Sequence, residues 1–328
     1  MKKAQYTQRG PVPQASIECV EFADPVLGEG QVLLQVLAAP INPSDVLTLT
    51  GEYGRLPPLP AIGGNEGVGK VVAHGPGVST PPLGQTVLLP IGLGSWATHV
   101  VADAAHLMPL PNDADPLQLA MMTVNPPTAS LLLSEFVDLQ PGEWVIQNAA
   151  NSGVGEYLVQ LARRRGLKTV NVVRRDSAVA AVQAAGGDVV LVDGPDLGRR
   201  VAAATGQETI RLAIDAIGGQ ATNRLAGCVG EGGTLVNYGM LSGEDCVVSP
   251  RAFVFRDVSL RGFWLALWFR KATPPQQMAM FGEIGKLIAT GQLKARIQAT
   301  YDLPQIKQAV AAAAAGERDG KILIVPKV

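Results

Sequence analysis

A regular alternation of strand and helix patterns, from about residue 128 to residue 264, is the feature that most limits how this chain folds. Apolar, β-branched runs predict strands at residues 144–150, 168–173, 188–192, 210–217, 233–238 and 258–264. A first helix is predicted before these strands, at residues 129–136. Between the strands, amphipathic or Ala-rich segments predict helices at residues 153–165, 177–185, 196–204 and 220–228. Six strands joined by crossover helices predict an α/β fold with a doubly wound parallel sheet.

The first 120 residues follow a different pattern. Short β-like runs at residues 31–38, 68–73 and 86–89 are separated by Gly and Pro, which predicts a mostly antiparallel β domain. The tail contains two helical stretches and a strand, at residues 275–290, 303–315 and 321–325. Because this tail follows the sixth strand, we expect it to return to the first domain. The expected domains are therefore 1–122 with 266–328, and 123–265.

Composition narrows the class of protein. The 328 residues are 47% hydrophobic and 17% charged, with 27 basic and 28 acidic side chains and a formal net charge of -1. These values indicate a soluble globular protein and argue against disorder and against a nucleic-acid partner. No apolar run approaches the roughly 20 residues of a membrane span, and no apolar segment follows the basic N-terminus. We therefore expect a cytoplasmic protein without a membrane partner.

The cysteines and histidines do not suggest a metal site. Cys19, Cys228 and Cys246 are far apart and lack C-x-x-C spacing, which argues against a disulfide framework and a Cys-rich zinc site. We expect them to be buried thiols. The three histidines lack the spacing of a ligand motif, so no metal is expected.

The sharpest local signal is the glycine-containing turn between the first predicted parallel strand and its helix. Residues 149–155 read Ala-Ala-Asn-Ser-Gly-Val-Gly. In such a turn Gly153 allows backbone N–H groups to approach a pyrophosphate, and Gly155 allows close packing of helix on sheet. The segment departs from G-x-G-x-x-G, because Ala149 and Ser152 stand where the first two glycines are expected. A tight turn without a ligand is the alternative.

The end of the next strand indicates which nucleotide would bind. An NAD site carries an acidic residue about 20 residues after the turn, whereas this strand is followed by Arg174 and Arg175. Arginines there can pair with a 2'-phosphate, which favours NADPH over NADH. Two arginines on a solvated loop are the alternative interpretation.

Several motifs together resemble a known family. They are residues 41–45 (Ile-Asn-Pro-Ser-Asp), 51–54 (Gly-Glu-Tyr-Gly), 63–67 (Gly-Gly-Asn-Glu-Gly), 124–126 (Val-Asn-Pro), 147–155 and 261–264 (Arg-Gly-Phe-Trp). The chain resembles the zinc-free medium-chain dehydrogenases/reductases, and among them the mitochondrial-type trans-2-enoyl-CoA or acyl-carrier-protein reductases. This resemblance implies a GroES-like catalytic domain, a Rossmann NADPH-binding domain and a homodimer.

The resemblance also implies a chemistry. Zinc-dependent relatives carry a Cys where Asn42 stands and a His where Asn65 stands, so the resemblance implies no zinc. Without a Lewis acid, reduction of an activated C=C bond remains, and it needs a proton donor at carbon. Tyr53 resembles the catalytic tyrosine of the family, and its phenol can donate a proton. A surface-loop tyrosine is the alternative for this residue.

Further site residues are carried over from the family. With the turn and the two arginines above, the expected cofactor contacts are Asn42, Asn125, Thr128, Asn151, Ser152, Gly153, Val154, Arg174, Arg175, Tyr238, Gly239, Met240, Phe263, Trp264, Leu265 and Lys321. The segment after Tyr238 is one glycine shorter than in the family, so contacts there are expected to shift. Trp264 also fits a core role, and Glu66 is expected only in a buried polar turn.

Three functions remain open from the sequence. The first is reduction of 2-enoyl thioesters carried on CoA or acyl carrier protein. The second is a zinc-independent NADPH:quinone or enone oxidoreductase of the same superfamily. The third is an NADPH-binding protein with no catalytic role.

Overall fold

A computed structural model describes residues 1–316 and 318–327, and the chain forms two compact units. Unit 1 comprises Met1–Val124 and Phe281–Val328, and unit 2 comprises Asn125–Met280. The domain limits expected from the sequence, 1–122 with 266–328 and 123–265, differ from these units mainly over residues 266–280. As domain limits they stay a prediction.

Unit 2 is built on the parallel sheet that the alternation predicts. All neighbouring strands pair in parallel, in the order β11-β10-β9-β12-β13-β14. The strands are β9 (Trp144–Gln147), β10 (Lys168–Val173), β11 (Val189–Val192), β12 (Ile210–Asp215), β13 (Thr234–Asn237) and β14 (Ser259–Gly262). This is the doubly wound order, in which the direction of winding reverses between the first and fourth strands, β9 and β12. The predicted fold class is confirmed.

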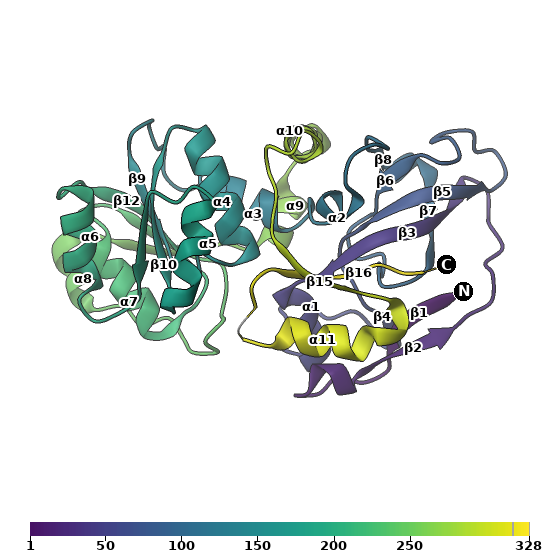
Figure 1. The fold of residues 1–328 in the computed structure, drawn as a ribbon, viewed down its shortest axis with the longest axis horizontal. Helices are drawn as coiled ribbons and strands as arrows, with labels where there is room; N and C mark the ends of the chain where they lie inside the picture. The colour runs from purple at the N-terminus through teal and green to yellow at the C-terminus, as the bar shows by residue number, and fades with distance from the viewer. Residues whose placement is uncertain (317, 328) are drawn as a thin grey trace. The chain divides into compact units, whose positions relative to one another are not determined.

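Helices cover both faces of this sheet (Figure 1). On one face α4 and α5 pack through Val159 and Val182, and on the other α6, α7 and α8 supply Leu197, Leu225 and Ala252 to a separate apolar core. The helices of unit 2 include α3 (Asn125–Leu132), α4 (Gly153–Arg164), α5 (Val179–Ala184), α6 (Leu197–Thr205), α7 (Gly219–Cys228), α8 (Pro250–Arg256) and α9 (Leu265–Lys271). Helices α8 and α9 were not predicted.

Unit 1 is mostly antiparallel, as expected. Its larger sheet has the order β15-β16-β3-β5-β6-β8, with β7 also paired to β3, and a smaller sheet has the order β2-β1-β4. The strands are β1 (Lys2–Tyr6), β2 (Ile17–Glu21), β3 (Gln31–Ile41), β4 (Ala61–Ile62), β5 (Val68–His74), β6 (Thr86–Leu88), β7 (His99–Asp103), β8 (Met108–Pro109), β15 (Ile297–Tyr301) and β16 (Lys321–Ile324). The pair β15 and β16 is parallel.

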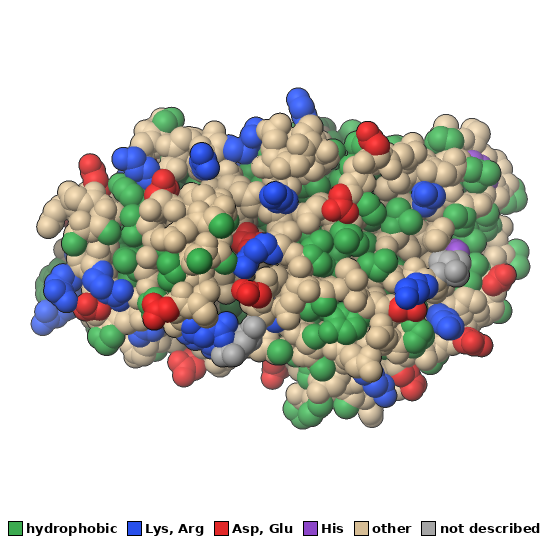
Figure 2. All heavy atoms as spheres, in the orientation of Figure 1, with side chains coloured by type: hydrophobic (Ala, Val, Ile, Leu, Met, Phe, Trp, Pro, Cys, Tyr) green, Lys and Arg blue, Asp and Glu red, His purple; other side chains and the backbone are tan. Residues whose placement is uncertain are grey.

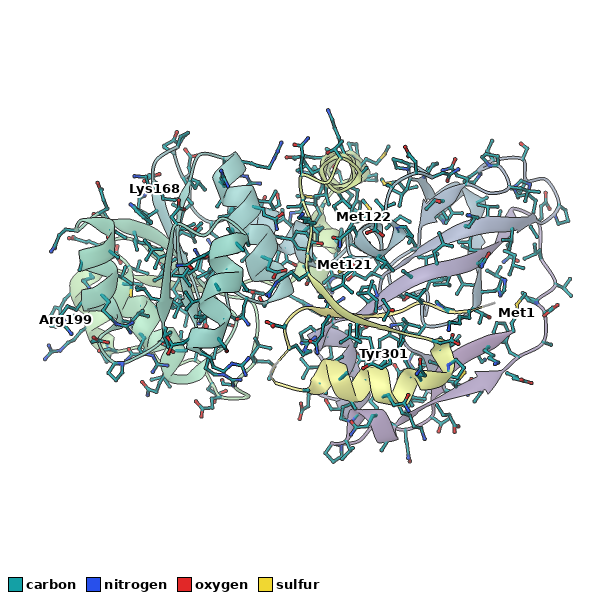
Figure 3. The ribbon with its side chains drawn as sticks, in the orientation of Figure 1. Met1, Met121, Met122, Lys168, Arg199 and Tyr301 are labelled. Atoms are coloured by element: carbon teal, nitrogen blue, oxygen red, sulfur yellow. The ribbon has the colours of Figure 1, made fainter. Side chains whose placement is uncertain are left out.

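The C-terminal tail completes unit 1. Strand β16 pairs antiparallel with β3, with Ile322 opposite Ile41, so the predicted return of the tail to the first domain is confirmed. The helices are α1 (Pro43–Thr50), α2 (Pro116–Leu119), α10 (Pro274–Ala289), which crosses the unit limit, and α11 (Ile306–Ala314). The core of unit 1 joins buried residues of α11 to those of β3, and Met121 and Met122, just after α2, are fully buried (Figure 3).

The distribution of charged side chains on the surface agrees with the formal net charge of -1. On the face in Figure 2, Lys and Arg side chains are interspersed with Asp and Glu. Within residues 1–316 and 318–327, no helix is long and apolar enough to cross a membrane.

The prediction of three buried thiols is wrong for Cys246, which is exposed in the loop between β13 and α8, while Cys19 and Cys228 are half-buried.

Candidate functional site

Most of the predicted cofactor residues of unit 2 lie at the carboxyl ends of its parallel strands. Residues 151–154 follow β9, Arg174 and Arg175 follow β10, residues 238–240 follow β13, and residues 263–265 follow β14. Because these strands are parallel, their carboxyl ends lie along one edge of the sheet, which is where α/β proteins bind ligands. The structure thus brings together segments that are up to about 110 residues apart in sequence.

The turn after β9 has the geometry of an anion-binding helix start. Ser152 is the N-cap of α4, and its Oγ accepts a hydrogen bond from the backbone N–H of Gly155 at 3.1 Å. A Cβ on Gly155 would lie 2.5 Å from the carbonyl oxygen of Ala150, so glycine is required there. Ala149 has φ 46°, in the left-handed region that favours glycine. An alanine therefore occupies a glycine-like conformation at the start of the turn.

Tyr238 connects the β13 edge to the same turn. Its hydroxyl forms a side-chain hydrogen bond with Ser152, and burial raises its pKa above the ordinary value. The Tyr238 phenol therefore stays protonated near neutral pH. The neighbouring Met240 is half exposed.

The remaining cofactor candidates of unit 2 lie on α3 and around the start of α9. Asn125 and Thr128 are buried on α3. Phe263 packs edge-on against Phe136 with ring centroids 6.0 Å apart, and Arg270 lies over the ring of Trp264 at 5.6 Å. The aromatic side chains of this segment therefore have packing partners inside unit 2, and a cofactor contact for them stays a prediction.

In unit 1, Tyr53 is held by the C-terminal end of α1. Gly51, with φ 92°, ends the helix in the left-handed conformation. The backbone N–H of Tyr53 then donates to the carbonyl oxygen of Leu47 at 3.2 Å, and that of Glu52 to the same oxygen at 2.9 Å. Tyr53 is half-buried, and its backbone is anchored to α1.

The other end of α1 carries a buried polar cluster, which we call the Asn42 cluster. The Asn42 amide donates to Glu66 Oε1 at 2.6 Å, and its Oδ1 accepts from the ammonium of Lys321. The Asn42 N–H donates to Asp45 Oδ2 at 2.7 Å, and the Asn65 amide donates to Asp45 Oδ1 at 2.6 Å. One eight-residue helix therefore joins this cluster to the Tyr53 loop.

Glu66 also holds the last residues of the N-terminal part of unit 1. Its Oε2 accepts from the backbone N–H groups of Thr123 at 3.0 Å and Val124 at 2.9 Å. Glu66 is fully buried, as expected for a residue in a buried polar turn. The segment that its carboxylate fixes leads directly into Asn125.

Burial controls the ionisation of the cluster. It raises the pKa of Asp45 to about 6 and that of Glu66 to about 7, while the Lys321 ammonium lowers both. Lys321 is itself buried, with 5% of its surface exposed. Its predicted role as a cofactor contact stays a prediction, because its ammonium here bonds Asn42.

The donor set of the Asn42 cluster does not fit zinc. Side-chain amides stand at both positions where zinc-dependent relatives carry Cys and His, and the ammonium of Lys321 already supplies a positive charge. Across the described part of the chain, no group of three or more His, Cys, Asp or Glu residues is arranged to hold a metal ion.

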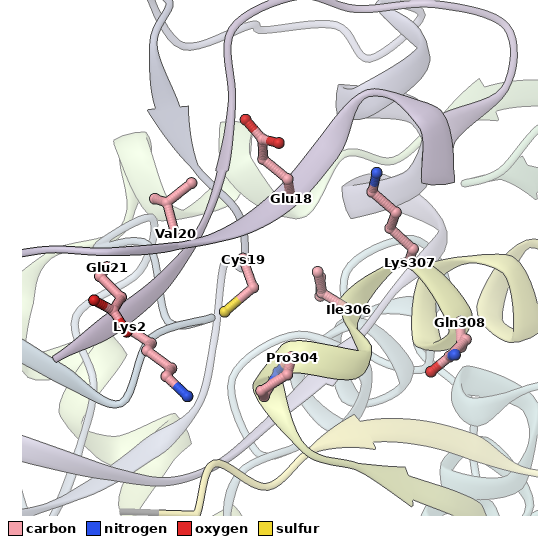
Figure 4. A pocket seen from close by; sticks show the side chains of 9 residues that line it. All are labelled: Lys2, Glu18, Cys19, Val20, Glu21, Pro304, Ile306, Lys307 and Gln308. Atoms are coloured by element: carbon pink, nitrogen blue, oxygen red, sulfur yellow. The ribbon is translucent and has the colours of Figure 1, made fainter.

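A pocket of about 500 Å³ opens elsewhere in unit 1 (Figure 4). None of the predicted site residues lines it, and its lining residues are Lys2, Glu18, Cys19, Val20, Glu21, Pro304, Ile306, Lys307 and Gln308. Burial raises the pKa of the Cys19 thiol above its ordinary value, so this thiol is not activated as a nucleophile. The charged lining residues have both signs, and we assign the pocket no chemistry.

Sequence reasoning missed two groups of buried polar residues. Asp45 was not singled out, although it accepts hydrogen bonds within the Asn42 cluster. Asp215 and Asn148, hydrogen-bonded at the ends of β12 and β9, were also missed. For Asn148 and Asp215 the available signal was a polar residue at the end of an apolar strand, at the edge where cofactors bind.

Comparisons with known proteins agree with this architecture. Residues 28–112 match the alcohol dehydrogenase GroES-like domain, and residues 153–281 match the zinc-binding dehydrogenase family. The chain is 38% identical over 288 residues to a mitochondrial enoyl-(acyl-carrier-protein) reductase of Rattus norvegicus, covering 86% of this chain and 77% of that protein.

Two solved structures are similar over nearly the whole chain. A putative NADPH:quinone reductase from Bacillus thuringiensis has a TM-score of 0.89 at 29% identity, covering 99% of both chains. The complex of Etr1p with NADP and crotonyl-CoA has a TM-score of 0.86 at 25% identity, also covering 99% of both chains. With its two matched domains and its close relative, the chain belongs to the medium-chain dehydrogenases/reductases, in the family of the mitochondrial enoyl-(acyl-carrier-protein) reductases.

Proposed function

We propose that this protein uses NADPH to reduce the C=C bond of trans-2-enoyl thioesters, with Tyr53 as the proton donor. The observation that carries the proposal is the 38% identity to an enoyl-(acyl-carrier-protein) reductase over 86% of the chain. It is supported by the similarity to Etr1p, whose structure contains NADP and crotonyl-CoA. The chain is accordingly an NADPH-dependent oxidoreductase.

Each half of the chemistry has a physical basis in the chain. When bound, NADPH supplies the hydride that adds to the β-carbon of the substrate. The turn at Ser152 would hold the pyrophosphate with backbone N–H groups at the start of α4. Arg174 and Arg175, at the end of β10, would hold the 2'-phosphate.

Protonation completes the reaction. Addition at the β-carbon leaves negative charge on the thioester oxygen, and a proton must then reach the α-carbon. The Tyr53 phenol can donate this proton, and its anchoring to α1 through Leu47 restricts where the side chain can lie. Positioning of this kind lowers the entropic cost of the proton transfer.

A specific observation also favours a second candidate. The similar structure with a TM-score of 0.89 is a putative NADPH:quinone reductase. Reduction of a quinone at oxygen needs no dedicated acid to protonate a carbon. The dependence on Tyr53 therefore separates the two activities.

Steady-state kinetics test the proposal. We would follow NADPH oxidation with crotonyl-CoA, trans-2-decenoyl-CoA, an enoyl-acyl carrier protein and 1,4-benzoquinone, with NADH as a control and EDTA present. Turnover of the thioesters with NADPH is the expected result, and the ratio of CoA to carrier-protein substrates identifies the carrier. Turnover of benzoquinone alone would move the protein to the quinone reductases, and NADPH binding without turnover would indicate a non-catalytic role.

The Tyr53→Phe variant tests the proton donor. We expect kcat for crotonyl-CoA to fall by about a hundredfold or more, the usual contribution of a general acid, with NADPH affinity retained. Tyr301→Phe, which removes a phenol from the half-buried strand β15, is the matched control and should keep its activity. Unchanged thioester reduction by Tyr53→Phe would remove Tyr53 from the mechanism.

We also propose a homodimer formed through the edge strand β14. All four residues of β14 are exposed, and the nearby α8 exposes Val254 and Phe255 to 71% and 75%. An open strand edge beside apolar side chains can pair with the same strand of a second copy. Sedimentation should give a dimer for the native chain and a monomer for Phe255→Asp, and a native monomer at micromolar concentration would contradict this proposal.

A further inference from the structure

Asp215 occupies the point of the unit 2 sheet where the winding reverses. It is the last residue of β12, which neighbours β9, and none of its surface is exposed. The reversal between these two strands is where doubly wound sheets bind their ligands, just outside the carboxyl ends. The buried carboxylate of Asp215 therefore lies at the carboxyl end of β12, next to the segments predicted to bind the cofactor.

Five hydrogen-bond donors converge on this carboxylate. Oδ1 accepts from the Asn148 side-chain amide at 2.6 Å and from the backbone N–H groups of Ile217 at 2.9 Å and Gly218 at 3.3 Å. Oδ2 accepts from the Thr222 hydroxyl at 2.7 Å and the Asn237 side-chain amide at 3.0 Å. All five partners are donors, and the two carboxylate oxygens are the acceptors that they share.

Two of the donors hold segments of the cofactor edge. Asn148 lies between β9 and the turn that begins at Ala149, and its Oδ1 accepts from the N–H of Ala216 at 2.8 Å. Asn237 is the last residue of β13, and its amide also donates to the carbonyl oxygen of Gly239 at 2.9 Å. The carboxylate thus ties the pyrophosphate-type turn to the segment at residues 238–240.

The third side-chain donor, Thr222, does not lie at the cofactor edge. Thr222 lies within α7, which contributes none of the predicted cofactor residues. Its hydrogen bond joins the carboxylate to α7, which packs in the core shared with α6 and α8 and not in the core beneath α4 and α5. The Thr222 bond can therefore be compared with the two asparagine bonds as one that does not reach the cofactor edge.

The backbone around Asp215 leaves little freedom for this arrangement. The N–H of Tyr238 donates to the Asp215 carbonyl oxygen at 2.9 Å. A Cβ on Gly239 would lie 2.7 Å from the carbonyl oxygen of Ala216, so the two loops are in close contact. The segment at residues 238–240 therefore lies directly against the loop that follows Asp215, where the carboxylate bonds set its fine position.

We infer that Asp215 is a positioning residue for the dinucleotide, holding the turn through Asn148 and the nicotinamide-side segment through Asn237. The inference rests on the proposed function only in taking NADPH as the ligand of this edge. It assigns the two asparagines separate tasks. Asn148 orients the part that meets the pyrophosphate, and Asn237 orients the part that meets the nicotinamide half.

Binding measurements can separate these tasks from turnover. We would titrate the full-length protein with NADPH, by its fluorescence, and with 2'-phospho-ADP-ribose, which lacks the nicotinamide, by calorimetry. The variants are Asp215→Asn, Asn148→Ala, Asn237→Ala and Thr222→Val, and Tm is measured for each. Crotonyl-CoA reduction is followed in parallel, so that failure of turnover is seen separately from failure of binding.

The inference gives a different result for each variant. Asp215→Asn and Asn148→Ala should weaken both ligands by about tenfold, the size of one lost buried hydrogen bond. Asn237→Ala should weaken NADPH by about tenfold and leave 2'-phospho-ADP-ribose within about twofold. Thr222→Val should lower Tm and leave both affinities within about twofold.

Other outcomes would overturn the inference. Equal affinity losses in Thr222→Val and Asn148→Ala at a matched fall in Tm would reduce Asp215 to a general structural role. Unchanged affinities in Asp215→Asn would have the same meaning. A native protein that does not bind NADPH at all would contradict the proposed function itself.

Discussion

The carboxylate of Glu66 accepts a hydrogen bond from the side-chain amide of Asn42 at 2.6 Å, and both residues are buried. The second oxygen of the same carboxylate accepts hydrogen bonds from the backbone N–H groups of Thr123 and Val124.

Glu66→Gln would place an amide NH₂ against one of these donors. We expect the free energy of unfolding to fall by about 1–3 kcal/mol, measured by urea denaturation, because a buried donor loses its acceptor.

A matched control is available on the surface of the same unit. Glu29 is exposed, so Glu29→Gln should change the free energy of unfolding by less than about 0.5 kcal/mol. Equal stability of Glu66→Gln and the native protein would show that the hydrogen bonds of this carboxylate contribute nothing.

Lys321 provides the compensating charge of the Asn42 cluster. Its ammonium bonds Asn42 and lowers the pKa of both Asp45 and Glu66. Lys321→Met should cost about 3–5 kcal/mol, because it leaves buried acidic groups without a cation. In a double-mutant cycle with Glu66→Gln, the combined loss should be smaller than the sum of the single losses by about 1 kcal/mol or more. Additive losses would mean that the two charges do not interact.

The raised pKa of Asp45 predicts how stability depends on pH. Its folded pKa of about 6 lies above the ordinary aspartate value of about 4, so between these values the folded chain binds more protons than the unfolded chain. The contribution of Asp45 is therefore fully present below about pH 4 and is lost as pH rises through about 6, by up to roughly 3 kcal/mol. Asp45→Asn should remove this dependence.

Urea denaturation between these pH values tests the assignment. The curve of stability against pH for the native protein should fall more steeply than that for Asp45→Asn. Asp113→Asn, at an exposed position, should follow the native curve. Parallel curves for the native protein and Asp45→Asn would contradict the assignment.

Much of the fold could be predicted because apolar runs and turn residues are local signals. All six strands of the parallel sheet were expected near their observed places. Five of them contain two or more of Val, Ile and Leu, as buried parallel strands do, whereas the edge strand β14 is exposed. Helices α8 and α9 were missed because each has only seven residues, about two turns, which is too short for a helical period to stand out in the sequence. Helix α1 was missed because its sequence reads as a motif of polar and proline residues.

The contacts within the candidate site could be predicted from the sequence only in part. The turn at Ser152 and the arginines after β10 carry local signals, and they were predicted. The partnership of Lys321 with Asn42 joins residues 279 positions apart, and no local pattern contains such a pair. The convergence on Asp215 likewise depends on strand order, which places β12 beside β9.

The turn after β9 offers a pair of opposite substitutions. Ala149 adopts φ 46°, so Ala149→Gly should relieve strain and raise the free energy of unfolding by about 1 kcal/mol. Gly155→Ala would bring a Cβ within 2.5 Å of a backbone oxygen and should lower the free energy of unfolding by about 2 kcal/mol or more. Thermal and urea unfolding measure both. Stabilisation by Gly155→Ala would contradict the close approach at the start of α4.

The arginines after β10 should decide between NADPH and NADH. Removing Arg174 or Arg175 should weaken NADPH by about ten- to a hundredfold, because a charge-assisted bond to the 2'-phosphate is lost. NADH lacks this phosphate, so its affinity should change by less than about threefold. Arg199→Ala is the control, since Arg199 lies on the surface of α6 and pairs with Asp196 at 3.0 Å (Figure 3). Fluorescence titration measures the affinities, and equal losses for both nucleotides would show that these arginines do not read the phosphate.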